Sequence, residues 1–307
     1  MQDKIEKLNK LRKERNAVIL AHYYTEGEIQ EVADFLGDSL ALAQAAKETT
    51  ADVILFCGVH FMAETAKILN PDKIVLLPDL EAGCSLADAA PEAEFRKWRE
   101  AHPNHTVISY INCSTQVKAM SDIICTSSNA ETIVNSVPEG TEICFAPDKH
   151  LGSYLSKKLN RKMELWDGSC QVHELFSEQS LIDTMQANPF ALVLAHPECP
   201  EHLLGYADYI GSTTGILNFA VKCDSKEFII LTEPGIMHQL KKNAPDKEFH
   251  TIAGLDGCSC NNCPYMKLNT IDKMIAALEN LEPRIELDED LRFKALKPLE
   301  RMLELSK

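Results

Sequence analysis

Short apolar runs without polar alternation recur along the chain, and each is followed by apolar residues at helical spacing. In the first part of the chain the runs lie at residues 17–21, 53–56 and 74–77, and helical patterns fill residues 29–36 and 40–47. Uninterrupted apolar runs of this length are typical of parallel strands that helices cover on both faces. The pattern predicts an α/β fold built on parallel sheets.

The same order returns twice. Further strands are predicted at residues 107–111, 123–128, 142–146 and 162–166, and again at 191–195, 209–214, 228–231 and 250–253. Matching positions keep a nearly constant spacing, since His22 to Tyr110 is 88 residues, Tyr110 to His196 is 86, and Cys84 to Cys170 is 86. A repeat of this length predicts three α/β units.

The repeat divides the chain into three expected domains, at residues 1–84, 85–170 and 171–263. The tail, residues 264–307, has two helical patterns with a break at Pro283. We expect these helices to join an N-terminal amphipathic helix in covering the first domain, because chain ends often lie close together.

Composition and charge narrow the function classes. The chain has 307 residues, of which 45% are hydrophobic and 25% charged, and its formal net charge is −15. This balance argues against nucleic acid or an anionic membrane as a partner, since both require a basic face. No apolar run approaches the roughly 18–20 residues that span a bilayer, and the charged N-terminus lacks the apolar core of a signal peptide. We therefore expect a cytoplasmic protein.

The chain contains 11 cysteines. An odd count without an export signal argues against a framework of disulfides. Cys57, Cys125 and Cys144 lie within apolar runs, where a free cysteine behaves as a small hydrophobic residue. The remaining cysteines include a cluster of three, Cys258, Cys260 and Cys263, near the end of the third unit.

Polar side chains follow corresponding strands in each unit, where ligands of open α/β sheets bind. After the first strand of each unit these residues are His22 with Tyr24, Tyr110 with Asn112, and His196 with Glu198. At the next turn they are Ser39, Ser127, and Ser212 with Thr213. A hydroxyl at a helix N-terminus suits an anionic substrate, although each of these residues could equally be a simple helix N-cap.

Cys84, Cys170 and one cysteine of the last cluster stand at corresponding ends of the units. Three thiolates around one point leave a metal or iron–sulfur cluster with an open coordination position, which favours Lewis-acid chemistry such as dehydration. Two alternatives stay open: a zinc or redox site in the last cluster alone, and an electron-transfer cluster, which usually has four ligands. Tyr24 and Glu198 are the acid–base candidates, and His173 is a ligand, a base or a surface residue.

Eight segments of the chain resemble the quinolinate synthase family, in the family's order and across nearly the whole sequence. They are Ala21-His-Tyr-Tyr24, Gly37-Asp-Ser39, Tyr110-Ile-Asn-Cys113, Cys125-Thr-Ser-Ser-Asn129, Asp167-Gly-Ser-Cys-Gln-Val-His173, His196-Pro-Glu-Cys199, Gly211-Ser-Thr-Thr-Gly215 and Cys263-Pro-Tyr-Met266. The resemblance implies three homologous three-layer α/β/α domains, with short parallel sheets, around a pseudo-threefold axis.

The resemblance also implies a transferase of NAD biosynthesis that condenses iminoaspartate with dihydroxyacetone phosphate, giving quinolinate, phosphate and two waters. It implies a [4Fe–4S] cluster on Cys84, Cys170 and Cys263, and a functional link to the enzyme that supplies iminoaspartate. Tyr24, His173 and Glu198 match catalytic positions. The implied substrate-binding positions are His22, Ser39, Tyr110, Ile111, Asn112, Ser127, His196, Pro197, Glu198 and Thr213.

The last cysteine cluster departs from the family pattern. Many members carry Cys-x-x-Cys-x-x-Cys, whose first two cysteines may form a disulfide, whereas this chain has Cys258-Ser-Cys260-Asn-Asn-Cys263. Bridging thiols one residue apart strains the ring, which argues against carrying over that disulfide. The spacing from Thr213 to Cys258 equals that from Ser39 to Cys84, at 45 residues. We nevertheless expect Cys263 to be the ligand, because Cys-Pro-Tyr-Met matches the family's ligand segment.

Overall fold

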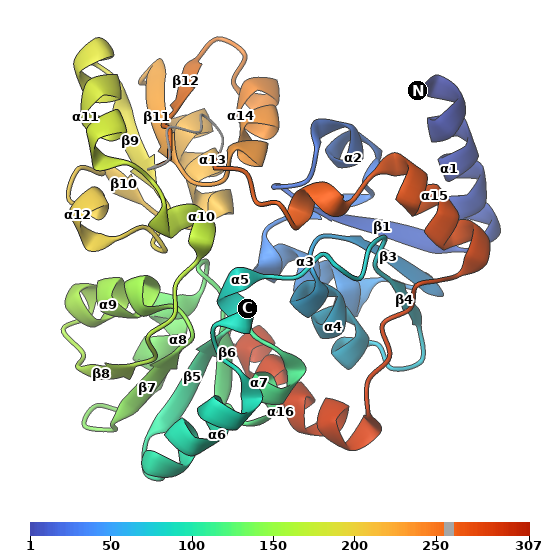
Figure 1. Cartoon of the computed structure of the whole chain (residues 1–307), viewed down its shortest axis with the longest axis horizontal. Helices are drawn as coiled ribbons and strands as arrows, with labels where there is room; N and C mark the ends of the chain where they lie inside the picture. Colours follow the sequence, from blue (N-terminus) through green and yellow to red (C-terminus); the bar gives the residue numbers. More distant parts are fainter. Residues whose placement is uncertain (255–260) are drawn as a thin grey trace.

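The computed structural model describes residues 1–254 and 261–307. It contains three four-stranded sheets whose strands all pair in parallel. Figure 1 shows the sheets in three lobes around a common centre, each with flanking helices. The predicted α/β fold of three repeated units is confirmed.

The first unit, in blue in Figure 1, carries the N-terminus. Its elements are α1 (Gln2–Glu14), β1 (Ala17–His22), α2 (Gly27–Val32), β2 (Phe35–Gly37), α3 (Ser39–Glu48), β3 (Val53–Cys57), α4 (His60–Leu69) and β4 (Ile74–Leu76). The sheet order is β2-β1-β3-β4. Every residue of β3 is buried, which agrees with its unbroken apolar run.

The second unit repeats this order as β6-β5-β7-β8. Its elements are α5 (Ser85–Asp88), α6 (Glu92–Ala101), β5 (Thr106–Tyr110), α7 (Thr115–Ala119), β6 (Ile123–Cys125), α8 (Ala130–Ser136), β7 (Ile143–Ala146), α9 (Lys149–Lys158) and β8 (Met163–Leu165). Cys125 and Cys144 are fully buried in its strands, as their apolar surroundings predict.

The third unit has the order β10-β9-β11-β12. Its elements are α10 (Gln171–Glu174), α11 (Glu178–Ala187), β9 (Leu192–Ala195), α12 (Glu201–Leu204), β10 (Tyr209–Ile210), α13 (Thr213–Lys222), β11 (Glu227–Leu231), η1 (Pro234–Ile236), α14 (Met237–Asn243) and β12 (Glu248–Thr251). In each unit the first and third strands are neighbours in the centre of the sheet. The second strand lies outside the first and the fourth lies outside the third, so strands are added in opposite directions from this central pair. Ligands of such sheets bind beyond the carboxyl ends of these two strands.

Two predictions of secondary structure were wrong. Residues 213–214 begin α13, where the sequence predicted the end of a strand. Residues 35–36 lie in β2, where the sequence predicted the end of a helix. The Asp34 side chain explains the difference, because its Oδ2 accepts the N–H of Ile19 at 2.9 Å and fixes the start of β2 beside β1. Asp122 and Asp208 accept the corresponding N–H groups of Val107 and Val193, both at 2.8 Å.

The C-terminal tail contains η2 (Met266–Leu268), α15 (Ile271–Asn280) and α16 (Glu289–Leu305). Helix α15 packs on α1 and β3 of the first unit, as expected. Helix α16 departs from the expectation, because it packs mainly on α7 and β6 of the second unit and also contacts α4.

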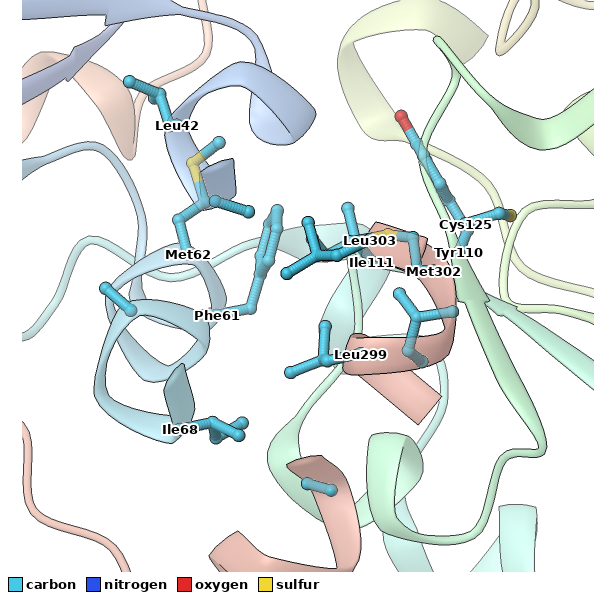
Figure 2. Packing of buried hydrophobic residues seen from close by; sticks show 14 of the residues in the cluster. Leu42, Phe61, Met62, Ile68, Tyr110, Ile111, Cys125, Leu299, Met302 and Leu303 are labelled. Atoms are coloured by element: carbon cyan, nitrogen blue, oxygen red, sulfur yellow. The ribbon is translucent and has the colours of Figure 1, made fainter. Parts of the chain in front are cut away.

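The position of α16 follows from its apolar face. Figure 2 shows Leu299, Met302 and Leu303 between Phe61 of α4 on one side and Tyr110 of β5 on the other. These five side chains belong to one buried cluster that extends across the first and second units. The tail therefore joins two units. None of the helices in residues 1–254 and 261–307 has the length and apolar character needed to cross a membrane.

Candidate active site

The polar residues at the strand ends surround one cavity of about 770 Å³, measured with its open mouth. All three units contribute to its wall. Of the residues predicted from the sequence, those that line it are His22, Tyr24, Ser39, Cys84, Tyr110, Asn112, Ser127, Cys170, His173, His196, Glu198, Thr213 and Cys263. Ile111 and Pro197 are buried and each is next in the chain to residues that line the cavity, so their part in binding stays a prediction.

Two buried histidines occupy corresponding positions in the first and third units. The Nδ1 of His22 accepts the N–H of Tyr24 at 3.2 Å, and the Nδ1 of His196 accepts the N–H of Glu198 at 3.3 Å. Burial lowers the pKa of His22 to about 4 and that of His196 to about 3. Both imidazoles are therefore neutral at pH 7, with the proton on Nε2, and each can donate a hydrogen bond to a ligand.

Glu198 lies at the centre of a second set of contacts and is only 3% exposed. Its Oε1 accepts the Tyr110 hydroxyl at 2.5 Å, and its Oε2 is 3.1 Å from the Nδ1 of His173. Burial by itself raises the pKa of Glu198, but His173, His196 and the hydrogen bond from Tyr110 together lower it below the usual value. Glu198 is therefore an ionised carboxylate in the cavity wall.

A chain of hydrogen bonds connects the third unit to Tyr24 of the first. The His173 Nδ1 is 3.3 Å from the Cys170 Sγ, and its Nε2 is 3.0 Å from the Thr232 hydroxyl. Thr232 is hydrogen-bonded to the Tyr24 hydroxyl at 2.7 Å, and Tyr24 also contacts Thr213 at 2.6 Å. Burial raises the pKa of Tyr24 well above its usual value, so the phenol holds its proton at neutral pH.

The position of His173 excludes the surface interpretation, because its side chain is 2% exposed. It stacks on the ring of His196 at 4.8 Å between centroids. A ligand role and an acid–base role for His173 stay predictions; its ring contacts a thiol through one nitrogen and a hydroxyl through the other.

The three predicted cluster cysteines each precede a short helical turn. Cys84 is the N-cap of α5 and Cys170 that of α10, while Cys263 stands three residues before η2. The backbone N–H groups of each turn lie close to the thiol and oppose the rise in its pKa, which burial nevertheless brings to about 12 for Cys84. Such N–H groups stabilise a thiolate once a metal has displaced the proton.

The positions of these three thiols suit a cluster that needs three protein ligands. They come from three separate segments and line the same cavity, and they are close enough for Cys263 to raise the pKa of Cys84 and for Cys84 to raise that of Cys170. Among the described lining residues there is no fourth cysteine. Cys258 and Cys260 lie outside the described residues. The donor set therefore suits a [4Fe–4S] cluster with one iron open to substrate.

The hydroxyl turns are built differently from simple caps. Asp38 caps α3 by accepting the N–H of Ala41 at 3.2 Å, and Ser212 caps α13 by accepting that of Gly215 at 3.1 Å. The predicted residues Ser39 and Thr213 are therefore the first helical residues, and both line the cavity. Their hydroxyls are not used as caps.

Ser128 joins the turns of all three units. Its hydroxyl donates to the Asp38 Oδ2 at 2.6 Å and lies 2.8 Å from the Ser212 hydroxyl. This contact brings the turns that carry Ser39 and Thr213 to one point. The sequence analysis did not identify Ser128 or Asp38, although each stands beside a predicted hydroxyl.

The sequence analysis also missed Glu233, which lines the cavity and is 1% exposed. Burial raises its pKa, against the opposing effect of Lys267. A usable signal existed, because Glu233 stands two residues beyond the third strand of its unit, close to where ligands of such sheets bind.

Comparison with known proteins identifies the family to which this chain belongs. The family model for quinolinate synthetase A protein matches residues 6–304. A quinolinate synthase of Microcystis aeruginosa is 56% identical over 299 residues, covering 97% of this chain and 94% of that protein. Quinolinate synthases of Chloroherpeton thalassium and Prochlorococcus marinus are each 58% identical, over 99% and 96% of this chain and 95% and 89% of theirs. At this identity and coverage, the chain belongs to the quinolinate synthase family.

Proposed function

We propose that this chain condenses iminoaspartate with dihydroxyacetone phosphate to form quinolinate, with release of phosphate and two waters. One observation carries the proposal: three cysteines from three segments line the same cavity as the polar strand ends of all three units. Membership in the family and the fit of the thiols support a [4Fe–4S] cluster held by Cys84, Cys170 and Cys263. Such a cluster supplies an open iron that acts as a Lewis acid on a substrate oxygen.

The protein residues bind and orient the substrates. The neutral imidazoles of His22 and His196 offer Nε2–H donors to carboxylate or carbonyl oxygens. Ser39 and Thr213 add hydroxyl donors at the first turns of α3 and α13, where backbone N–H groups favour anionic groups. Asn112 supplies an amide to the same cavity. This wall of neutral donors suits substrates that carry carboxylates and a phosphate.

Proton transfers fall to Glu198 and Tyr24. Glu198 is ionised, buried and held by Tyr110 and His173, so it can accept a proton from bound substrate. The Tyr24 phenol is protonated and hydrogen-bonded to Thr213 and Thr232, so it can donate one.

The first test is the iron and acid-labile sulfide content of the protein purified without oxygen, followed by an assay for quinolinate. We expect about four of each per chain. Zinc without sulfide would refute the proposal, and it needs to be excluded because Cys170, His173 and Glu198 offer ligand atoms within 4.8 Å of one another.

The third ligand is tested by substitution. Cys263→Ser is expected to lose the cluster and all quinolinate formation, whereas Cys258→Ser retains both. Cys223→Ser is the matched control, since Cys223 lies outside the cavity. Loss of the cluster in Cys258→Ser, with a normal cluster in Cys263→Ser, would reverse the assignment.

We also propose domain boundaries at residues 1–84, 85–170 and 171–263, which the three separate sheets support. The contacts of α15 support its assignment to the first domain, while those of α16 favour the second.

The partner and location are proposed on separate grounds. An imine is readily hydrolysed in water, which favours a nearby enzyme that supplies iminoaspartate. A reducing compartment such as the cytoplasm agrees with the nine cysteines of the described residues, all of which are free thiols.

A further inference from the structure

A buried carboxylate holds the backbone of the third cluster cysteine. The Glu233 Oε1 accepts the N–H of Cys263 at 3.1 Å, while its Oε2 accepts the N–H of Gly235 at 2.6 Å. Glu233 is 1% exposed, so water does not replace these bonds. The third unit thereby fixes the segment that carries Cys263.

Lys267 provides a second contact between Glu233 and the segment that carries Cys263. Its Nζ lies 3.2 Å from the Glu233 Oε1, and the same Nζ donates to the backbone oxygen of Tyr24 at 2.8 Å. The ion pair neutralises a carboxylate that would otherwise be buried without a counter-charge. Through Lys267, the cysteine segment is tied to the third unit and to the turn that carries Tyr24.

The second unit has a carboxylate at the corresponding place. In the sheet registers, Ala146 is opposite Ser109 and Leu231 is opposite Ala195, at equivalent points of the two units. Two residues beyond Ala146 stands Asp148, and two residues beyond Leu231 stands Glu233. Sheet geometry therefore makes the two carboxylates equivalent.

Asp148 lies beside the segment that carries a cluster cysteine, since it forms an isolated parallel bridge with Gly168, two residues before Cys170. It is fully buried, and its Oδ1 caps α9 by accepting the N–H of Leu151 at 2.7 Å. Burial raises the pKa of Asp148 well above its usual value, and the N–H of Cys170 opposes this rise. Its Oδ2 has no partner at hydrogen-bond distance within residues 1–254 and 261–307. A buried oxygen of this kind is costly unless a nearby group uses it.

The first unit has an apolar residue in place of this carboxylate. Cys57 is opposite Ala21 in the first sheet, so the corresponding residue is Val59. The segment before Cys84 is held instead by the backbone, since the N–H of His60 donates to the oxygen of Ala82 at 2.7 Å. The carboxylates are thus specific to two of the three cysteine segments.

We propose that Glu233 and Asp148 are positioning residues that hold Cys263 and Cys170 in place for the cluster. The inference rests on the cluster of the proposed function. Groups that orient metal ligands commonly change metal affinity by about 10- to 100-fold when removed, and nearby charge is one of the factors that set a cluster's potential.

The test compares Glu233→Gln and Asp148→Asn with the wild type and with Glu64→Gln. Glu64 is a matched control because it is buried and its Oε2 accepts a backbone N–H, that of Thr115 at 3.2 Å, away from any cluster cysteine. Each protein is reconstituted without oxygen, and three quantities are measured: the rate of iron release to a chelator, the reduction potential of the cluster, and the melting temperature of the cluster-free chain.

We expect both variants to release iron at least about tenfold faster than the wild type and Glu64→Gln. We also expect a higher reduction potential in Glu233→Gln, because the substitution leaves the positive charge of Lys267 without its counter-charge. Release rates equal to those of the wild type in both variants would overturn the inference. Faster release together with a lower melting temperature of the cluster-free chain, and an unchanged potential in Glu233→Gln, would also overturn it. A wild-type protein that takes up no iron and sulfide would instead refute the proposed function itself.

Discussion

The hydrogen bond between Tyr110 and Glu198 offers a direct test of the electrostatics of the cavity. The hydroxyl donates to Oε1 at 2.5 Å, and the two residues are 4% and 3% exposed. Tyr110→Phe removes this hydroxyl and leaves the ring in the buried cluster that it shares with Ile111. The substitution therefore isolates the hydrogen bond from the packing of the ring.

The magnitude follows from burial and charge. A hydrogen bond to an ionised group contributes about 1.5–3 kcal/mol, and water cannot replace this one because Glu198 is enclosed. We expect Tyr110→Phe to lower the free energy of unfolding by about 2–3 kcal/mol. In a Glu198→Gln background the acceptor is neutral, so the same change should cost only about 1 kcal/mol. The coupling between the two sites is thus about 1–2 kcal/mol.

Urea denaturation of the cluster-free chain at pH 7 measures all four members of this cycle. Removing the cluster separates the hydrogen bond from any effect on metal content. Tyr206→Phe is the matched control, because the Tyr206 hydroxyl donates to the Glu178 Oε1 at 2.9 Å on the surface, and no measurable change is expected there. A Tyr110→Phe protein as stable as the wild type, or a coupling below about 0.5 kcal/mol, would refute the reasoning.

Three further outcomes are expected. Because burial lowers the pKa of His22 to about 4, the unfolded chain binds more protons than the folded one between pH 6.5 and 4, and the folded state loses stability as the pH falls through this range. Its contribution is on the order of 3 kcal/mol, so urea midpoints of His22→Asn should depend less on pH than those of the wild type; equal slopes would contradict this. Leu299→Ala, at a fully buried site between two units, should cost about 2–5 kcal/mol by the same measurement, whereas Phe293→Ala, at a residue 70% exposed, should cost nothing; equal losses would exclude the packing of α16 as the cause. Tyr24→Phe should retain iron and sulfide but lose most of its quinolinate formation, because it removes the proposed proton donor, the hydroxyl that Thr213 and Thr232 share. Full turnover would exclude Tyr24 as a proton donor.

The fold could be predicted from the sequence because its signals are local and repeated. Unbroken apolar runs marked the buried strands, and the 86–88 residue spacing marked the units. Strand β2 was not predicted, because a strand of three residues is too short to show a hydrophobic pattern of its own. The repeat contained the missing signal, since Asp34, Asp122 and Asp208 have the same 88- and 86-residue spacing and accept equivalent backbone N–H groups.

The contacts between units could not be predicted in this way. The apolar face of α16 shows that the helix is buried, but not which sheet covers it, and the structure places it mainly on the second unit. For the same reason Lys267 reads as a surface charge in the sequence. Its role depends on Glu233 and Tyr24, which lie far away along the chain and come together only when the units assemble.

The repeat explains why one cavity can carry several kinds of proton chemistry. In each unit, one residue of the cavity wall stands two positions after the polar residue at the end of the first strand. These residues are Tyr24, Asn112 and Glu198, which carry a phenol, an amide and a carboxylate. A symmetric backbone thus presents three unlike groups to the same space, and hydrogen bonds across the units hold Tyr24 and Glu198 in place. A condensation with loss of two waters requires both proton donors and acceptors near one substrate. The departure of the side chains from the threefold pattern supplies both, while the common strand ends keep them in place.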